Sequence, residues 1–484
     1  MPSHFECWEV FAMVEEATKI SGASRLRRPA APVPHSRNLS TLAFILELGK
    51  NPIAAFGARA YREHYVYERS RLRHFLMVAH PDGIKHVLLD NASNYVKSAQ
   101  AQRQLKLALG NGLVTAEGAS WRFQRRTAAP MFQTRQIAAF APAMADAVEA
   151  MLARWRSLPA GAEVDIADAM MRLTYDIISR TMFSNDVTMD YGEMSKALAT
   201  YFENVGRVDI LGALGFPDWV PTPRRLRAWP ALRFFRREMD GLISRRRTAL
   251  SENPAAVPQD LLTLLLTARD PEGGKLFGEA EVFDNVMTFI FAGHETTANT
   301  LAWTFYLLSE FPEWDARVAQ EARHALGGGL ADGENIVGLV QSRMVIEEAM
   351  RLYPPAPLMA RDAVGPDTVG GIAIEPGTFV LVPIWVIHRH RALWKDPDNF
   401  DPERFAPGAR ETIHRFAYLP FGGGPRICIG MGFAMQEAAV ILASVAREFR
   451  LSLKPGHPVE PMARITLRPH HGLAMTVWRR DTSN

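Results

Sequence analysis

Apolar residues recur at helical spacing in two long segments of the chain, residues 138–182 and residues 278–310. Leu, Ala, Met and Arg dominate these segments, and these residue types favour helices. Runs typical of strands are few and short, and Gly or Pro bounds each of them, at residues 75–79, 379–383, 450–453 and 473–478. The pattern predicts an α+β protein that is mainly α, with small β-sheets beside a helical mass.

The length of 484 residues and the 48% share of hydrophobic residues allow a large buried core. No Ser/Gly-rich linker divides the interior of the chain. Residues 25–34, RLRRPAAPVP, are first basic and then rich in proline, so they cannot be helical and mark the entry to the folded body. We therefore expect an N-terminal segment over residues 1–37 and a single domain over residues 38–484.

Charge and cysteine usage narrow the class of protein. The net charge is only +3, and without zinc-finger spacing or an aromatic-basic motif we expect no nucleic acid as a partner. Cys7 and Cys428 lie too far apart in sequence to form a disulfide framework. Residues 1–23 contain several glutamates, unlike a signal peptide, and no apolar run approaches the roughly 18 residues of a membrane span. These features favour a cytoplasmic monomer with no membrane span.

Residues 421–430, FGGGPRICIG, place Cys428 in a glycine-rich loop that leads into a helical segment, residues 431–449. A metal-bound thiolate needs shelter from water and nearby N–H donors, which a tight turn at a helix N-terminus supplies. Gly424 and Gly430 permit close approach of a flat ligand, and Arg426 can reach a carboxylate at its edge. Structural zinc would need further Cys or His ligands at set spacings, and no second cysteine is near.

Residues 292–297, AGHETT, interrupt the second apolar segment with small and polar residues. Gly costs about 1 kcal/mol in a helix relative to Ala, and Thr can bond back to a carbonyl, so we expect a local opening or bulge. His294 should lie on the helix surface. The opposite face, which we expect to line the site, presents Phe289, Ala292, Gly293, Thr296 and Thr300.

The loop resembles the FxxGxRxCxG signature of the cytochrome P-450 family, and the resemblance extends from about residue 73 to the C-terminus. It implies a cytochrome P-450 fold with haem b between a long distal helix, which carries Glu295 and Thr296, and the proximal loop and helix of Cys428, the axial iron ligand. It also implies a monooxygenase that inserts one oxygen atom of O2 into a hydrophobic substrate by hydroxylation or epoxidation. The signature is matched by Phe421, Gly424, Arg426, Cys428 and Gly430.

The resemblance also implies roles for three further motifs. Glu348 and Arg351 match the ExxR pair of the family, and with Arg404 of the PERF segment they resemble its buried salt-bridge triad. Trp121 and Arg125, four residues apart, match the WxxxR pair that binds a haem propionate. Two other arginines would assist them, Arg361 and Arg426, although Arg361 could equally be a solvated surface residue.

Residues 292–296 resemble the (A/G)Gx(D/E)T motif, in which an acid and a hydroxyl relay protons to the oxygen being reduced. Thr296 would then hold oxygen and a water molecule by hydrogen bonds, and Glu295 would pass protons from solvent. The alternative is a polar break in a core helix without a catalytic role.

The sequence after Cys428 is too short for a flavin or ferredoxin domain, so we expect NAD(P)H electrons through a separate ferredoxin or flavodoxin and its reductase. Arg122, Arg126 and Arg135 form a candidate docking patch for such an acidic partner, or simply a solvated basic face. The family places apolar pocket walls at residues 104–115, 201–235 and 356–360, including Leu358 and Met359, and on the helix face of Phe289 and Ala292. A small hydrophobic substrate follows. A peroxide-using peroxygenase and a non-catalytic haem sensor remain alternatives.

Overall fold

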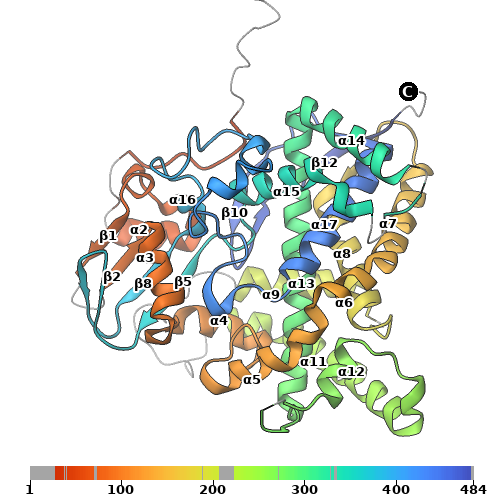
Figure 1. Ribbon diagram of the computed structural model, residues 1–484, viewed down its shortest axis with the longest axis horizontal. Helices are drawn as coiled ribbons and strands as arrows, with labels where there is room; N and C mark the ends of the chain where they lie inside the picture. Colours follow the sequence, from red (N-terminus) through yellow and green to blue (C-terminus); the bar gives the residue numbers. More distant parts are fainter. Residues whose placement is uncertain are drawn as a thin grey trace, which may run out of the picture.

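The computed structural model describes residues 28–480, apart from residues 37–38, 40, 70–73, 188, 206–222, 271, 328 and 332–334. Cys7, most of the expected N-terminal segment and part of the expected pocket wall at residues 201–235 lie outside the described residues. The described chain is mainly helical with small sheets, which confirms the predicted fold class (Figure 1).

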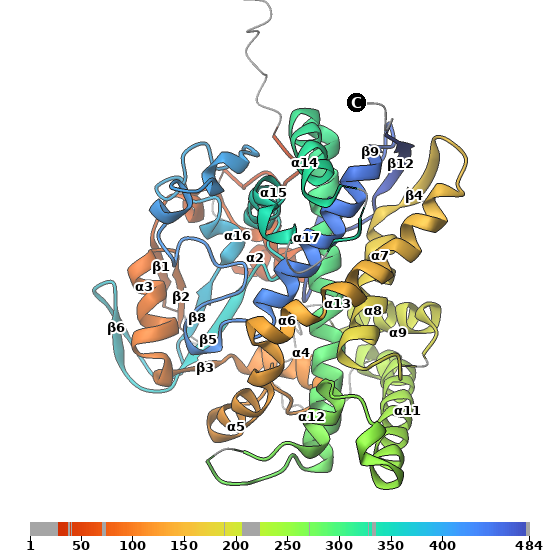
Figure 2. The ribbon, with the colours of Figure 1, turned by 45° about the vertical axis from the view of Figure 1, so that its right-hand side comes forward.

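The longest of the described helices, α13, is central and lies beside α17 in both views (Figures 1 and 2). The helices are α2 (Thr41–Lys50), α3 (Pro81–Lys85), α4 (Ala99–Leu109), α5 (Gly118–Ala128), α6 (Thr134–Ala139), α7 (Ala141–Arg156), α8 (Ile166–Met182), α9 (Tyr191–Val205), α11 (Pro223–Glu252), α12 (Leu261–Thr267), α13 (Glu279–Glu310), α14 (Pro312–Leu326), α15 (Val340–Leu352), α16 (Ile384–Ile387) and α17 (Met431–Glu448).

Short strands form four small sheets among the described residues, and the largest lies to one side of the helical body (Figure 1). Its order is β1-β2-β8-β5-β3, and the others are β4-β12-β9, β10-β11 and β6-β7. The strands are β1 (Tyr65–Glu68), β2 (Phe75–Val78), β3 (Tyr95–Lys97), β4 (Ala162–Asp165), β5 (Met359–Ala363), β6 (Asp367–Val369), β7 (Ile372–Ile374), β8 (Phe379–Val382), β9 (Phe449–Leu453), β10 (Pro461–Ala463), β11 (Leu467–Pro469) and β12 (Ala474–Arg479).

All four predicted strand segments are present, as β2, β8, β9 and β12. The helical pattern over residues 138–182, in contrast, contains the strand β4 between α7 and α8. This strand pairs with β12, so a partner more than 300 residues away determines its conformation. Such a tertiary contact overrides the local helical pattern.

The prediction of an opening in the second long helix is wrong, because α13 runs as a continuous α-helix through residues 292–297. Gly293 instead allows α8 to pack closely, since a Cβ there would lie 2.0 Å from Cδ1 of Ile178. The Thr296 hydroxyl donates to the Ala292 carbonyl at 2.9 Å, so back-bonding occurs without breaking the helix.

The prediction that His294 lies on the helix surface is also wrong. Its side chain is 1% exposed, and its Nδ1 lies 2.6 Å from the Ile290 carbonyl oxygen. Tyr175 of α8 packs edge-on against the imidazole ring. The face opposite the site is therefore also covered, because α8 packs along α13.

None of the helices that the structure describes is both long enough and apolar enough to span a membrane.

Candidate functional site

The loop that holds Cys428 is shaped by its glycines and closed by a backbone hydrogen bond. Gly424 has a φ of +69°, and a Cβ there would lie 1.8 Å from the Leu88 carbonyl oxygen, so only glycine fits. The Cys428 N–H donates to the Phe421 carbonyl at 2.9 Å. Gly430 then ends the loop as the N-cap of α17. The loop thus presents Cys428 next to a helix N-terminus, as the sequence predicts.

Protein atoms surround much of the Cys428 sulfur, and this burial raises the pKa of its thiol. The backbone N–H of Gly430 and the guanidinium of Arg125 act in the opposite direction, because both stabilise a thiolate. The side chain is nevertheless exposed, so one side of the sulfur faces space that protein atoms do not fill. A thiolate with two electrostatic supports and one open side is suited to bind a metal centre.

Helix α5 lies against this loop and brings Trp121 and Arg125 to it. Arg125 donates to the Ile427 carbonyl at 2.8 Å, and the Arg426 guanidinium lies 4.5 Å from the centre of the Trp121 ring. The sequence pairs Trp121 with Arg125 by their spacing and by the resemblance to the WxxxR motif, and the structure places both beside the cysteine loop. Arg426 also forms an ion pair with Glu117, a carboxylate that sequence reasoning did not identify.

Two further cations surround Glu117. Arg361 is 8% exposed, so it is no solvated surface residue, and burial together with the nearby Arg426 lowers its pKa to about 10. Lys97 of β3, which sequence reasoning missed, has a pKa lowered to about 7, first by burial and then by Arg426. Its ammonium donates to the Val114 carbonyl, and its backbone N–H donates to the Glu117 carboxylate at 3.0 Å.

Three cations that repel one another around a single carboxylate leave a surplus of positive charge beside the cysteine loop. Removing buried cations from water costs free energy unless anions neutralise them. A ligand with two carboxylates would supply that neutralisation. The donor set therefore fits haem, whose iron would meet Cys428 and whose two propionates would meet Lys97, Arg361 and Arg426.

The middle of α13 faces open space on one side, although most of this helix is buried. Ala292 is exposed, and Gly293 and Thr296 are partly exposed, whereas His294, Glu295 and Thr297 are buried. Phe289 is buried and stacks on Phe132, with ring centres 5.6 Å apart. Ala292 and Thr296 therefore border the open space, and Phe289 lies in an aromatic pair at its side.

Glu295 is 3% exposed, and its carboxylate accepts a hydrogen bond from the Thr466 hydroxyl at 2.5 Å. Burial raises the pKa of Glu295, while the hydrogen bond from Thr466 and the nearby Arg468 charge oppose the rise. Glu437 of α17 is also fully buried, and burial raises the pKa of its carboxyl well above the usual range. Neither Thr466 nor Glu437 was recognised from the sequence, since no motif pointed to them.

Glu348 and Arg351 form a fully buried pair on α15. The Arg351 Nε and Nη2 donate to the two carboxylate oxygens of Glu348 at 2.6 and 2.7 Å. Arg404 lies 3.6 Å from the same carboxylate. The remaining Arg351 N–H groups donate to backbone carbonyls of His388, Pro397 and Asn399. The three residues of the predicted triad are thus in one cluster.

The predicted docking patch is only partly free. Arg122 and Arg135 are exposed, but Arg126 forms ion pairs with Asp270 at 3.0 Å and Glu272 at 2.8 Å. Two carboxylates more than compensate the charge of Arg126, so the prediction that Arg126 adds to a basic patch is wrong. The Asp270 segment follows α12, and no spacing in the sequence shows that it meets α5.

Leu358 and Met359 are partly exposed at the start of β5. The Met359 sulfur lies 3.8 Å from the Arg361 guanidinium, so residues 356–360 lie next to the cations around Glu117. Ala356, at the far end of this segment, is exposed. These residues provide apolar surface near the charged groups. That residues 356–360 form a wall of the substrate pocket stays a prediction.

Comparison with known proteins agrees with this geometry. Residues 38–475 match the family model "Cytochrome P450". The chain is 35% identical over 383 residues to cyclooctat-9-en-7-ol 5-monooxygenase of Streptomyces melanosporofaciens, covering 78% of this chain and 81% of that protein. It is 33% identical to cyclooctatin synthase of the same organism, covering 80% of this chain and 83% of that protein.

A solved structure is similar over nearly the whole chain. The crystal structure of the cytochrome P450DA heme domain superposes with a TM-score of 0.80 at 28% identity, covering 94% of this chain and 99% of that chain. The match of sequence and fold, together with the cysteine loop and its cationic surroundings, establishes that this chain belongs to the cytochrome P450 family.

Proposed function

We propose that this protein is a haem-thiolate monooxygenase, formed by one domain over residues 38–484, that hydroxylates or epoxidises a hydrophobic substrate. The observation that carries the proposal is the Cys428 sulfur, which is supported by Arg125 and the Gly430 N–H and is open on one side. When bound, haem supplies activation of O2, so that one oxygen atom enters the substrate and the other leaves as water with two electrons and two protons.

In this proposal Cys428 would bind the haem iron through its thiolate, with Phe421 and Gly430 fixing the backbone on either side of it. Arg361, Arg426 and Lys97 hold the propionates, and Arg125 and Trp121 support them from α5. The support for this assignment is the surplus of buried positive charge around Glu117. Glu348, Arg351 and Arg404 are proposed to be structural, since their polar groups bond to each other and to nearby backbone carbonyls.

Thr296 and Glu295 are proposed to deliver protons. Thr296 borders the open space on α13, and because its hydroxyl proton bonds to the Ala292 carbonyl, the hydroxyl oxygen remains free to accept a hydrogen bond from a water molecule there. Glu295 is buried and bonded to Thr466, so protons would reach it through that hydroxyl and not directly from solvent. Because the pKa of Glu295 is raised, its carboxyl keeps a proton to higher pH than usual, and its capacity to donate falls as pH rises through that pKa.

The substrate is proposed to be a small hydrophobic compound, such as a fatty acid, a terpenoid or an aromatic. Apolar side chains border the site at Ala292, Leu358 and Met359. One relative is named as a monooxygenase of an alkenol, cyclooctat-9-en-7-ol, which is in keeping with such a class. A screen of hydrophobic compounds for spectral changes of the ferric protein would identify ligands of the pocket.

The function is tested by comparing electron sources on any accepted substrate. We expect product formation with a ferredoxin or flavodoxin, its reductase, NAD(P)H and O2, and much slower formation with hydrogen peroxide alone. Efficient turnover with peroxide alone would favour a peroxygenase. Haem binding without product from either source would favour a sensor.

Replacing Thr296 with alanine should uncouple NAD(P)H consumption from product formation. The change removes the hydroxyl but leaves the cysteine loop unchanged. Electrons therefore still reach O2, while protons are no longer delivered through a positioned hydroxyl. The amount of product per NAD(P)H should fall about tenfold, a smaller factor than general acid–base catalysis usually contributes. The amount of hydrogen peroxide per NAD(P)H should rise. Thr300→Ala is the matched control, because Thr300 makes the same back-bond one turn along the helix. An equal amount of product per NAD(P)H in Thr296→Ala and in the parent would show that Thr296 is not part of the proton path.

Replacing Arg122 with glutamate should slow reduction by an acidic donor. Arg122 is exposed on α5, the helix that contacts the cysteine loop through Arg125, so it adds positive charge to the surface near that loop. At low ionic strength the rate constant for reduction should fall about threefold to tenfold, and added salt should reduce the difference. Arg154→Glu, an exposed charge on α7, is the control. The same reduction rate in the two variants would show that the donor does not dock at α5.

A further inference from the structure

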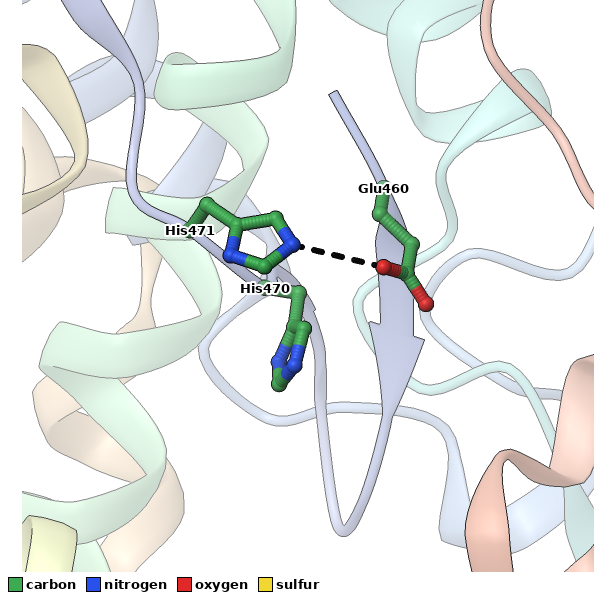
Figure 3. A group of neighbouring side chains, drawn as sticks. All are labelled: Glu460, His470 and His471. Atoms are coloured by element: carbon green, nitrogen blue, oxygen red, sulfur yellow. Dashed lines mark ion pairs between the residues drawn. The ribbon is translucent and has the colours of Figure 1, made fainter. Parts of the chain in front are cut away.

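Three potential metal ligands gather at the open end of the β10–β11 hairpin, away from the cysteine loop. Pro461 of β10 pairs with Pro469 of β11, so the next residues outward, Glu460 and His470, continue the two strands. The His470 N–H donates to the Glu460 carbonyl at 2.9 Å, which fixes these two residues side by side. His471 follows directly, and Figure 3 shows its ring directed at the Glu460 carboxylate.

The side-chain distances are those of a nearly formed metal site. The His471 Nε2 lies 3.4 Å from a carboxylate oxygen of Glu460, and the rings of His470 and His471 have centres 4.5 Å apart (Figure 3). One ligand atom from each of the three residues lies within 4.8 Å of the others. Zinc–ligand bonds of about 2.0–2.1 Å require ligand atoms about 3.3 Å apart in a tetrahedron, so the Glu460–His471 pair already has the required spacing.

The backbone holds the two histidines in place. Gly472 has a φ of +67°, and a Cβ there would lie 2.2 Å from the Asp165 carboxylate, so a glycine turn ends the segment directly after His471. The imidazole of His457 lies 3.1 Å from the Gly472 carbonyl oxygen and bridges the same turn. All three potential ligands are exposed, so only side-chain rotation is needed to bring His470 to the distance of the other two.

We propose that Glu460, His470 and His471 bind a divalent ion of the zinc class. Two imidazoles and one carboxylate are a ligand set that suits Zn²⁺, with a fourth position left for water, whereas Ca²⁺ and Mg²⁺ prefer sites built from oxygen ligands. The ion links the outer ends of β10 and β11. It therefore restrains the hairpin whose turn carries Thr466, the residue that bonds to Glu295. The metal site stands independently of the proposed reaction.

Calorimetric titration of the haem-loaded full chain with Zn²⁺ alone, after removal of trace metals, tests the site. We expect one binding event that weakens at least about tenfold in Glu460→Gln and in the double variant His470→Ala/His471→Ala, since each change removes ligands. Mg²⁺ should not compete. His324→Ala, which alters an exposed histidine outside the three, should bind Zn²⁺ as the parent does. Unchanged Zn²⁺ affinity in the double variant would overturn the proposal.

Amide hydrogen exchange separates this site from surface binding elsewhere. Zn²⁺ should slow exchange at the amides of β10 and β11 in the parent by at least about threefold, and should have no such effect in the double variant. Because the three side chains are exposed, the variants are expected to fold, and unchanged far-ultraviolet circular dichroism checks this. Equal exchange with and without Zn²⁺ in the parent would overturn the restraint of the hairpin.

Discussion

Replacing Cys428 with alanine should abolish both the red-shifted absorption of the reduced carbon monoxide adduct and the monooxygenase activity. A thiolate donates electron density to iron, and alanine has no atom that can take its place. The loop itself should persist, because its shape depends on Gly424 and on the bond from the residue 428 N–H to the Phe421 carbonyl, which alanine retains. Absorption spectra and product formation with a supplied redox partner are the measurements.

The change Cys7→Ala is the control for this experiment. Cys7 is the other cysteine of the chain, and the proposal gives it no role. The parent spectrum and activity should therefore persist in Cys7→Ala. If Cys428→Ala kept the red-shifted band and the activity, the central assignment of Cys428 would be wrong.

The sequence predicted those parts of the site whose residues are close together in the chain. The cysteine loop is contiguous, and the positions of its glycines follow from local backbone conformation. Glu348 and Arg351 lie one helical turn apart, so a helix alone brings them together. Trp121 and Arg125 share one face of α5 for the same reason.

The missed residues are those that only the tertiary fold brings to the site. Glu117 and Arg426 are 309 positions apart in the sequence, and Glu295 and Thr466 are 171 apart. Lys97 lies on β3, which joins the sheet through β5. No local pattern encodes these pairings, and with a single sequence the strand order of the sheet could not be predicted either.

The predictions for His294 and Arg126 were wrong for the same reason, which is packing by an element distant in sequence. His294 is polar and out of phase with the site, so an isolated helix would expose it, but α8 covers that face. Arg126 is neutralised by Asp270 and Glu272, which approach from the segment after α12. Helical spacing gives the direction of a side chain but not what lies in that direction.

Replacing Arg351 with methionine should lower the free energy of unfolding by about 3–5 kcal/mol, the usual cost of removing one partner of a buried ion pair. The carboxylate of Glu348 would remain fully buried with only Arg404, at 3.6 Å, and the Asp401 N–H nearby. Three backbone carbonyls would also lose their donor. Denaturant unfolding followed by circular dichroism measures the change.

Two companion variants show whether burial is the cause. Arg343 forms an ion pair with Glu347 on the same helix but is 68% exposed, so Arg343→Met should cost no more than about 1 kcal/mol. Glu348→Gln leaves the buried guanidinium of Arg351 without its counter-charge and replaces one of the two accepting oxygens with an N–H donor that faces other donors. It should therefore also destabilise the protein by about 3–5 kcal/mol. Equal losses in Arg351→Met and Arg343→Met would mean that the buried pair contributes no more to stability than a surface pair.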